Sequence, residues 1–247
     1  MQNPLRRNRN IGTPKQGNGR NNRHRLPFSY AVSKYFYERL EAYEIHEREM
    51  QGHLFKIVVE ATREDSFHAC SGDDICAVLE CVSPEDYGEL SLIILRQPKR
   101  REERLSPVWG RFIYSYEFDE EYQPAVILEA VSQSRKLKWP RKLSLAEQEE
   151  LSRLQVDGHK FVQGKREWTA PLDPLAVRRT QLWRTLPHEI GHYVHYYREV
   201  IRPDPDQEDL DAWVQRMEKF DAIPESEKEA FAHRYASEIQ KRFPANL

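Results

Sequence analysis

Residues 182–196 read LWRTLPHEIGHYVHY, and this stretch constrains the fold more than any other part of the 247-residue chain. Apolar residues recur along it at the spacing of a helix that buries one face: Leu182, Trp183, Leu186, Ile190 and Val194. Gly191 stands inside the predicted helix, where a glycine costs about 1 kcal/mol relative to alanine. We therefore expect another segment of the chain to approach the helix closely at Gly191.

Two histidines of this helix are candidate metal ligands. His188 and His192 lie four residues apart, so their side chains project from one face about a turn apart. Two neutral imidazoles at that separation can bind one tetrahedral Zn²⁺. Glu189 completes an HExxH pattern, in which the glutamate is the general base toward a metal-bound water. The alternative interpretation is a helix with two surface histidines and no metal.

A catalytic zinc site needs a third protein ligand. His195 lies on the same stripe, but a helix rises about 1.5 Å per residue, which displaces His195 from a metal held between His188 and His192. In the last predicted helix, residues 229–236 read EAFAHRYA and place small residues on the face that carries Glu229. Small side chains let two helices approach closely, so we predict Glu229 as the third ligand. The alternative is a solvated acid in the first helical turn, favoured by the helix dipole.

The two motifs together resemble those of a known family. HEIGH at 188–192, followed 37 residues after its second histidine by EAFAHRYA, is similar to the gluzincin metallopeptidases, and in style to the ImmA/IrrE-type proteins among them. The similarity covers residues 182–239. It implies a zincin-like fold in which an edge strand of the sheet receives the substrate beside the active-site helix. Residues 108–118 would be that strand.

The rest of the chain predicts an α+β fold with a mixed or antiparallel sheet of about five strands. The composition of residues 33–50 favours a helix that ends near Gly52. Strand-like runs then follow at 54–61, 75–82, 90–95, 108–118 and 125–131. After Pro140 the pattern becomes helical, with helices expected at 144–158, 173–186, 187–201, 206–220 and 224–243. We divide the chain into a tail at 1–25 and a domain at 26–247, with helix and sheet at 26–140 and a helical, metal-binding part at 141–247.

Charge is distributed unevenly along the chain. The first 37 residues hold eight Lys or Arg and no acid, whereas the remainder holds 30 basic and 40 acidic residues. Residues 1–25 are nearly free of apolar side chains, so we predict a disordered basic tail. Its candidate partners are an acidic protein, nucleic acid or a delivery apparatus; the alternative is a solvated tail without a ligand. Three cysteines without CxxC spacing, no secretory signal and no membrane-spanning run favour a cytoplasmic location.

These features predict a zinc endopeptidase that acts on a protein or peptide. Glu189 would take a proton from the metal-bound water and return it to the leaving amine. His233, His195 and Tyr235 are candidates for a further donor to the oxyanion, or for residues that pack beside the ligands. Two alternatives stay open. One is a regulatory metal-binding protein with little catalysis, and the other is a protease delivered as an effector or toxin, with the basic leader as its packing or export signal.

Overall fold

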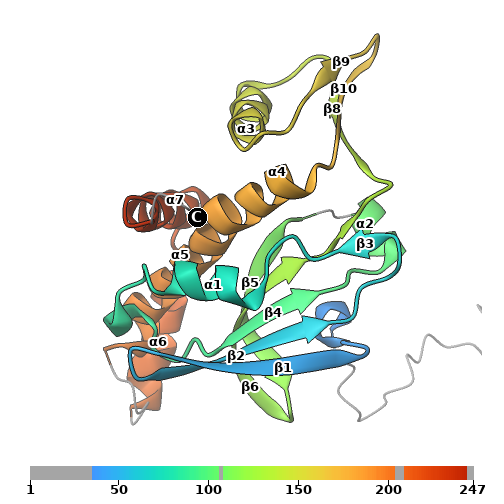
Figure 1. The fold of residues 1–247 in the computed structure, drawn as a ribbon. Helices are drawn as coiled ribbons and strands as arrows, with labels where there is room; N and C mark the ends of the chain where they lie inside the picture. Colours follow the sequence, from blue (N-terminus) through green and yellow to red (C-terminus); the bar gives the residue numbers. More distant parts are fainter. Residues whose placement is uncertain (1–34, 106–107, 204–208, 244–247) are drawn as a thin grey trace, which may run out of the picture. The chain divides into compact units, whose positions relative to one another are not determined.

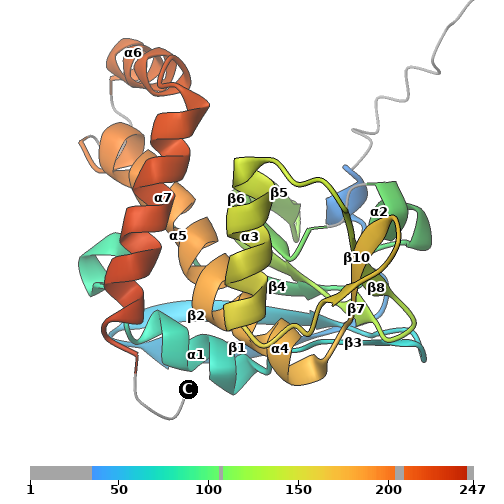
Figure 2. The same ribbon diagram turned by 90° about the horizontal axis from the view of Figure 1, so that it is seen from above.

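The computed structural model describes residues 35–105, 108–203 and 209–243. Apart from Phe36, the first residue of a short 3₁₀ turn, the elements described below belong to the unit formed by Tyr37–Leu247. The predicted tail at 1–25 lies outside the described residues. Figures 1 and 2 show a central sheet with several helices against one face. Among the described residues, no helix is both long and apolar enough to cross a membrane.

A five-stranded sheet with the order β1-β2-β4-β6-β5 organises the molecule. Its strands are β1 (Tyr43–Met50), β2 (His53–Glu60), β4 (Leu92–Arg96), β5 (Gly110–Phe118) and β6 (Glu121–Glu129). The three central strands, β2, β4 and β6, are parallel, while β1 and β5 are antiparallel edge strands. The predicted mixed α+β architecture is thus confirmed, and the predicted strand at 108–118 is an edge strand.

The predicted helix over residues 33–50 is wrong. Only a short 3₁₀ turn, η2 (Phe36–Glu38), lies there, and Tyr43–Met50 form the strand β1. β1 pairs along its whole length with the apolar β2 through the two-residue turn Gln51-Gly52. Both turn residues have positive φ, 52° and 80°, as a tight hairpin with the natural strand twist requires. Pairing with β2 therefore overrides the helix-favouring composition of this segment.

The predicted strand over residues 75–82 is also wrong, because Gly72–Leu79 form the helix α1. A capping box starts this helix: the Ser71 side chain accepts from the Asp74 N–H, and the Asp74 side chain accepts from the Ser71 N–H. Ile75, Val78 and Leu79 are buried at helical spacing. The β-branched and apolar run that favoured a strand is the buried face of α1.

Helices dominate the second half of the chain. They are α3 (Leu145–Val156), α4 (Pro174–Arg179), α5 (Leu186–Tyr196), α6 (Leu210–Asp221) and α7 (Glu225–Gln240). Two π-helical turns flank α5, at Thr180–Thr185 and Tyr197–Ile201. A capping box of Ser144 and Glu147 starts α3, at the residue where the sequence predicted a helix to begin. Asp209 caps α6, while the predicted start of that helix at 206 lies outside the described residues.

Small elements complete the fold. In the three-stranded sheet β8-β10-β9, strands β9 and β10 lie within the part predicted as helical, and β8 ends just before it. The remaining elements are β3 (Ser66–Phe67), β7 (Val131–Ser132), β8 (Lys136–Pro140), β9 (Val162–Gln163), β10 (Glu167–Pro171), α2 (Arg100–Leu105) and the 3₁₀ turn η3 (Pro84–Asp86). β3 pairs with β7 in a two-stranded sheet. In Figure 1, α3 and β8–β10 lie together, beyond α4 as seen from the large sheet.

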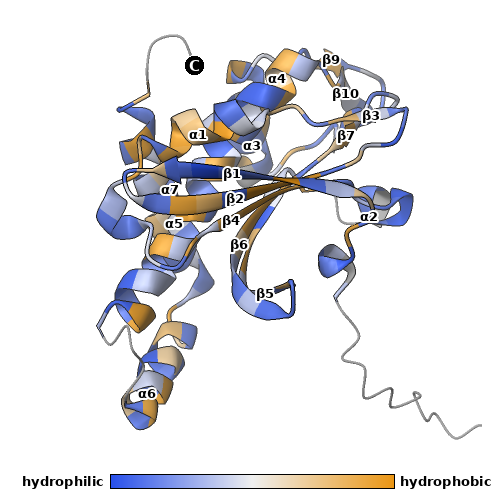
Figure 3. Cartoon of the chain, turned by 60° about the horizontal axis from the view of Figure 1, so that its bottom comes forward, coloured by the Kyte–Doolittle hydropathy of each residue, from blue (hydrophilic) through white to orange (hydrophobic). Residues whose placement is uncertain are grey.

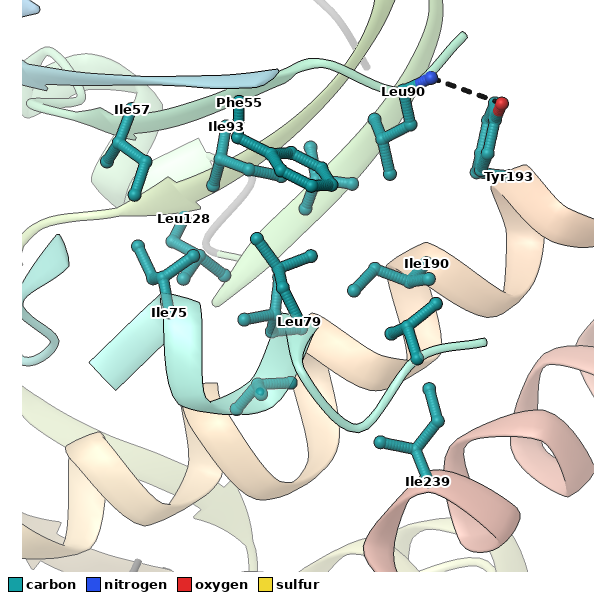
Figure 4. Packing of buried hydrophobic residues seen from close by; sticks show 14 of the residues in the cluster. Phe55, Ile57, Ile75, Leu79, Leu90, Ile93, Leu128, Ile190, Tyr193 and Ile239 are labelled. Atoms are coloured by element: carbon teal, nitrogen blue, oxygen red, sulfur yellow. Dashed lines mark hydrogen bonds between the residues drawn. The ribbon is translucent and has the colours of Figure 1, made fainter. Parts of the chain in front are cut away.

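The main core lies between the large sheet and the helices α1, α5 and α7. Phe55, Ile93 and Leu128 of the sheet pack with Leu79 and Ile190 of the helices, as Figure 4 shows. The Tyr193 hydroxyl accepts from the backbone N–H groups of Glu89 and Leu90 and so ties α5 to the start of β4. Figure 3 shows that β2 and β4 are largely apolar whereas β1 is polar, as expected for central and edge strands. Burial against the sheet therefore fixes the position of α5.

Candidate metal centre

The close approach predicted at Gly191 is present. A Cβ atom at Gly191 would lie 2.8 Å from the Ala232 Cα and 2.9 Å from the Ala232 carbonyl oxygen. Both neighbours are backbone atoms of α7, which cannot move aside as the end of a flexible side chain could. A side chain at position 191 therefore does not fit unless the two helices move apart. The helices α5 and α7 thus touch backbone to backbone at a point between the two histidines of α5, and this contact brings side chains of α7 within reach of both.

The contact gathers three ligand-type side chains. The Nε2 atoms of His188 and His192 lie 3.1 Å apart. Glu229 of α7 places one carboxylate oxygen 3.3 Å from His188 Nε2 and the other 3.4 Å from His192 Nε2. One ligand atom from each residue can be chosen so that all three lie within 4.8 Å of one another. The three residues form a group that could hold a metal ion.

The chemistry of these donors fits a cation between them. Burial is the main cause that lowers the pKa of His188, and together with the charges of His192 and His233 it brings the pKa to about 3. Burial likewise lowers the pKa of His192, while Glu229 and Glu225 oppose that effect. Both imidazoles are therefore neutral at pH 7, and a neutral imidazole is the form that binds a metal. A positive ion between the His188 and His192 nitrogens and the Glu229 carboxylate would interact favourably with all three groups.

Glu189 occupies the position expected of a base beside this group. Its Oε2 accepts a 2.8 Å hydrogen bond from the backbone N–H of Phe112, in the edge strand β5. Burial is the main cause that raises the pKa of Glu189. The Phe112 hydrogen bond and Arg111 oppose this effect and the nearby Glu229 adds to it, so that the pKa is about 7. The carboxylate is therefore oriented by β5 while it remains on the helix that carries the two histidines.

A cleft of about 590 Å³ opens on His188 and Glu189. Its walls come from the start of β5, the helix α3, the π-helical turn before α5, and the helices α5 and α7. The lining residues include Trp109, Gly110, Arg153, Arg184, His188, Glu189 and His233. A segment of substrate in this cleft would contact Glu189 and His188 directly.

The three further candidate residues lie in different surroundings. The His233 ring is 4.5 Å from the His188 ring and lines the cleft. His195 is buried, and its ring stacks on Phe231 at 4.2 Å. The Tyr235 hydroxyl donates to Asp86 in the core. Of the three, His233 is the one that the structure brings to the cleft.

Two contacts that position the site were missed from the sequence. The buried Gln181 side chain donates to the carbonyls of Trp109 and Glu129, and so ties the start of β5 to the turn that precedes α5. Arg111 of β5 pairs with Glu129, which also binds the buried Arg96. Neither contact has a local signature, because each joins residues at least 18 positions apart. The pairing of β5 with β6 brings Arg111 to Glu129, and the packing of the turn before α5 against these strands brings Gln181 to them.

Comparisons with known proteins add no assignment to this geometry. No family model, no curated protein and no solved structure matches the chain. The group of His188, His192 and Glu229 is therefore the observation from which function is inferred.

Proposed function

We propose that this chain is a zinc-dependent endopeptidase. The observation that carries the proposal is the convergence of His188, His192 and Glu229 beside Glu189. A set of two histidines and one carboxylate is typical of catalytic zinc sites that keep one position open. When bound there, zinc would act as a Lewis acid toward a substrate carbonyl and would make water a stronger nucleophile.

Glu189 is the proposed general base and acid. The Phe112 N–H holds one of its carboxylate oxygens at 2.8 Å, which leaves the other oxygen to accept a proton. A carboxylate fixed in this way can take a proton from the attacking water and deliver it to the leaving amine. The backbone contact with β5 limits the side chain to orientations near the histidines, which favours proton transfer over solvent exchange.

The edge strand β5 is the proposed support for an extended peptide. Among the strands that the described residues form, β5 is the last of the sheet, and none of these strands pairs with its outer side. The Phe112 N–H points away from β6 toward Glu189, so this outer side of β5 faces the proposed general base. A peptide added along an open sheet edge is held by main-chain hydrogen bonds, largely independent of its sequence. This arrangement would carry the bond to be cleaved past Glu189.

His233 is the proposed donor to the oxyanion. Its ring lies against His188 and lines the cleft, whereas the Tyr235 hydroxyl is engaged by Asp86. An N–H donor aimed at a developing negative charge typically contributes about 10²- to 10³-fold in kcat. Replacing His233 by Ala should therefore lower kcat by about that factor while zinc content stays the same. Loss of zinc together with activity would instead assign His233 to the support of the metal ligands.

The direct test of the proposed function is Glu189→Gln. The zinc-loaded wild type should cleave a proteome-derived peptide mixture, with cleavage sites read by mass spectrometry. Removal of a general base typically lowers the rate by about 10²- to 10⁴-fold, so the variant should lose cleavage while keeping its zinc. Glu199→Gln, an exposed acid on the turn that follows α5, is the matched control and should cleave normally. Undiminished cleavage by Glu189→Gln, or no cleavage by the zinc-loaded wild type, would exclude the proposal.

A further inference from the structure

A second cavity adjoins the cleft at His188 and Glu189 and is larger than that cleft. It measures about 790 Å³ and shares Val108, Trp109 and Glu150 with the cleft as lining residues. Its other walls come from the end of β6, from β7 and β8, and from the helices α2 and α3. The proposed mechanism uses none of these residues. The cavity therefore extends the cleft beyond the amino end of β5.

The cavity has an apolar floor. Trp109 and Leu172 belong to a buried apolar cluster together with Val131 and Leu137. All four line the cavity, as do Trp139 and Leu154. Two tryptophans among aliphatic side chains favour a bulky apolar group, because such rings offer large apolar area in a defined orientation.

Every acidic side chain in the lining is already neutralised. Glu102 and Glu129 pair with Arg96, and Glu129 also pairs with Arg111. Glu103 pairs with Arg63, and Glu150 pairs with Arg184. Each glutamate that lines this cavity is therefore engaged by an arginine, and one of these arginines, Arg111, lines the cavity as well.

Arg135 supplies a positive charge that these acids do not balance. It lies between β7 and β8, lines the cavity and is half-buried. In the described part of the chain its guanidinium forms no ion pair or hydrogen bond. Burial lowers the pKa of Arg135, and the charge of Glu103 offsets only part of that effect. A partly desolvated guanidinium without a partner favours a carboxylate ligand, which it can bind through two parallel hydrogen bonds.

The distance along β5 between Phe112 and Trp109 indicates which residue of a bound peptide would carry this carboxylate. Phe112, which contacts Glu189, follows Trp109 by three residues. Three residues of extended strand span about 10 Å. A peptide that runs along β5 thus needs about three residues to pass from Glu189 to the cavity at Trp109.

We propose that this cavity is a recognition subsite in which Arg135 binds a carboxylate of an extended peptide. The carboxylate lies about three residues or more along the peptide from the bond at Glu189. A neighbouring apolar residue of the peptide packs on Trp109 and Trp139. The inference rests on the proposed peptidase function for the course of the peptide along β5. Its ligand class follows from the lining alone. The carboxylate comes from an acidic side chain or from the carboxyl terminus of the peptide.

The test measures binding, so that it does not depend on cleavage. Zinc-loaded, full-length Glu189→Gln protein is incubated with a positional-scanning library of acetylated, amidated octapeptides, and bound peptides are identified by mass spectrometry. We expect Asp and Glu to be enriched about tenfold over Asn and Gln at one position. A second library with free carboxyl termini distinguishes the two sources, because enrichment of free acids over amides identifies the terminal carboxylate.

Arg135→Gln, added to Glu189→Gln, should abolish the enrichment in whichever library shows it. Arg166→Gln is the matched control, since it removes an exposed guanidinium outside the cavity lining and should keep the enrichment. Equal zinc content and thermal stability verify that both variants fold. Equal binding of acid and amide peptides in both libraries would overturn the subsite, as would enrichment that survives Arg135→Gln. Enrichment that depends on Arg135 in a protein whose wild type cleaves nothing would overturn the peptidase function and leave the subsite standing.

Discussion

The helix wall of the cleft, formed by α5 and α7, and its strand wall, formed by β5, are held in place by different contacts. The helix wall is held together by a direct contact between the backbones of α5 and α7, at Gly191 and Ala232. The strand wall is held by hydrogen bonds from polar side chains, chiefly those that the Gln181 amide donates to the carbonyls of Trp109 and Glu129. The first wall carries the three residues that could hold a metal ion, and the second would carry the substrate in the proposed function. The two functions should therefore be separable by mutation.

The largest effect is expected at Gly191, on the helix wall. Helix propensity alone would make Gly191→Ala stabilising by about 1 kcal/mol. The new Cβ would instead lie 2.8 Å from the Ala232 backbone, so we expect the free energy of unfolding to fall by about 3 kcal/mol and zinc affinity to fall with it. Chemical denaturation and zinc titration measure the two effects.

Gly72→Ala in α1 is the control for Gly191→Ala. A Cβ at Gly72 meets only the Ile57 side chain, at 3.7 Å, which is an ordinary contact. This variant should leave the zinc affinity unchanged and should raise the free energy of unfolding by up to about 1 kcal/mol, as helix propensity alone predicts. A Gly191→Ala protein as stable as Gly72→Ala would show that the backbone contact does not set the position of α7.

A smaller effect is expected at Gln181, on the strand wall. Gln181→Leu keeps the side-chain size but removes the donor to two carbonyls, which should lower the free energy of unfolding by about 2 kcal/mol. Peptide cleavage should fall because β5 loses its anchor, while zinc affinity should not change. Gln163→Leu, at an exposed position of β9, serves as control. If Gln181→Leu lost zinc as Gly191→Ala does, the two walls would not be independent.

The smallest effect is expected at Tyr235, in the core behind the helix wall. Its hydroxyl donates to the buried Asp86, whose carboxylate also holds Arg198 at 2.7 Å. Tyr235→Phe should lower the free energy of unfolding by about 1 kcal/mol, because Arg198 still compensates the charge of Asp86. Its kcat should equal that of the wild type. A large loss of kcat at unchanged stability would restore Tyr235 as a donor to the oxyanion.

The helix wall could be predicted from the sequence because its signals are local. The spacing of His188 and His192, the glycine between them, and the small residue Ala232 beside Glu229 each imply a neighbour on one helix face. The close approach of another segment to Gly191 is confirmed. The roles of Glu189 and Glu229 in metal binding and catalysis stay predictions until metal and activity are measured.

The strand side could be predicted only in part, because its structure depends on partners far along the chain. β1 was mistaken for a helix, since YEIHEREM becomes a strand only when paired with β2. α1 was mistaken for a strand, although the serine and aspartate at 71 and 74 form a capping box. The cavity at Arg135 joins residues from Pro98 to Leu172, so no single stretch of sequence indicates it.

The metal content of the purified protein tests the central claim most directly. Wild type, Glu229→Ala and Glu227→Ala would be dialysed against zinc and then against buffer, and the bound metal measured by atomic emission. Glu227 lies in the first turn of the same helix, is exposed and is not part of the metal group. We predict about one zinc per chain in the wild type and in Glu227→Ala, and far less in Glu229→Ala. A wild type without zinc, or a Glu229→Ala protein that keeps the full amount, would contradict the metal centre.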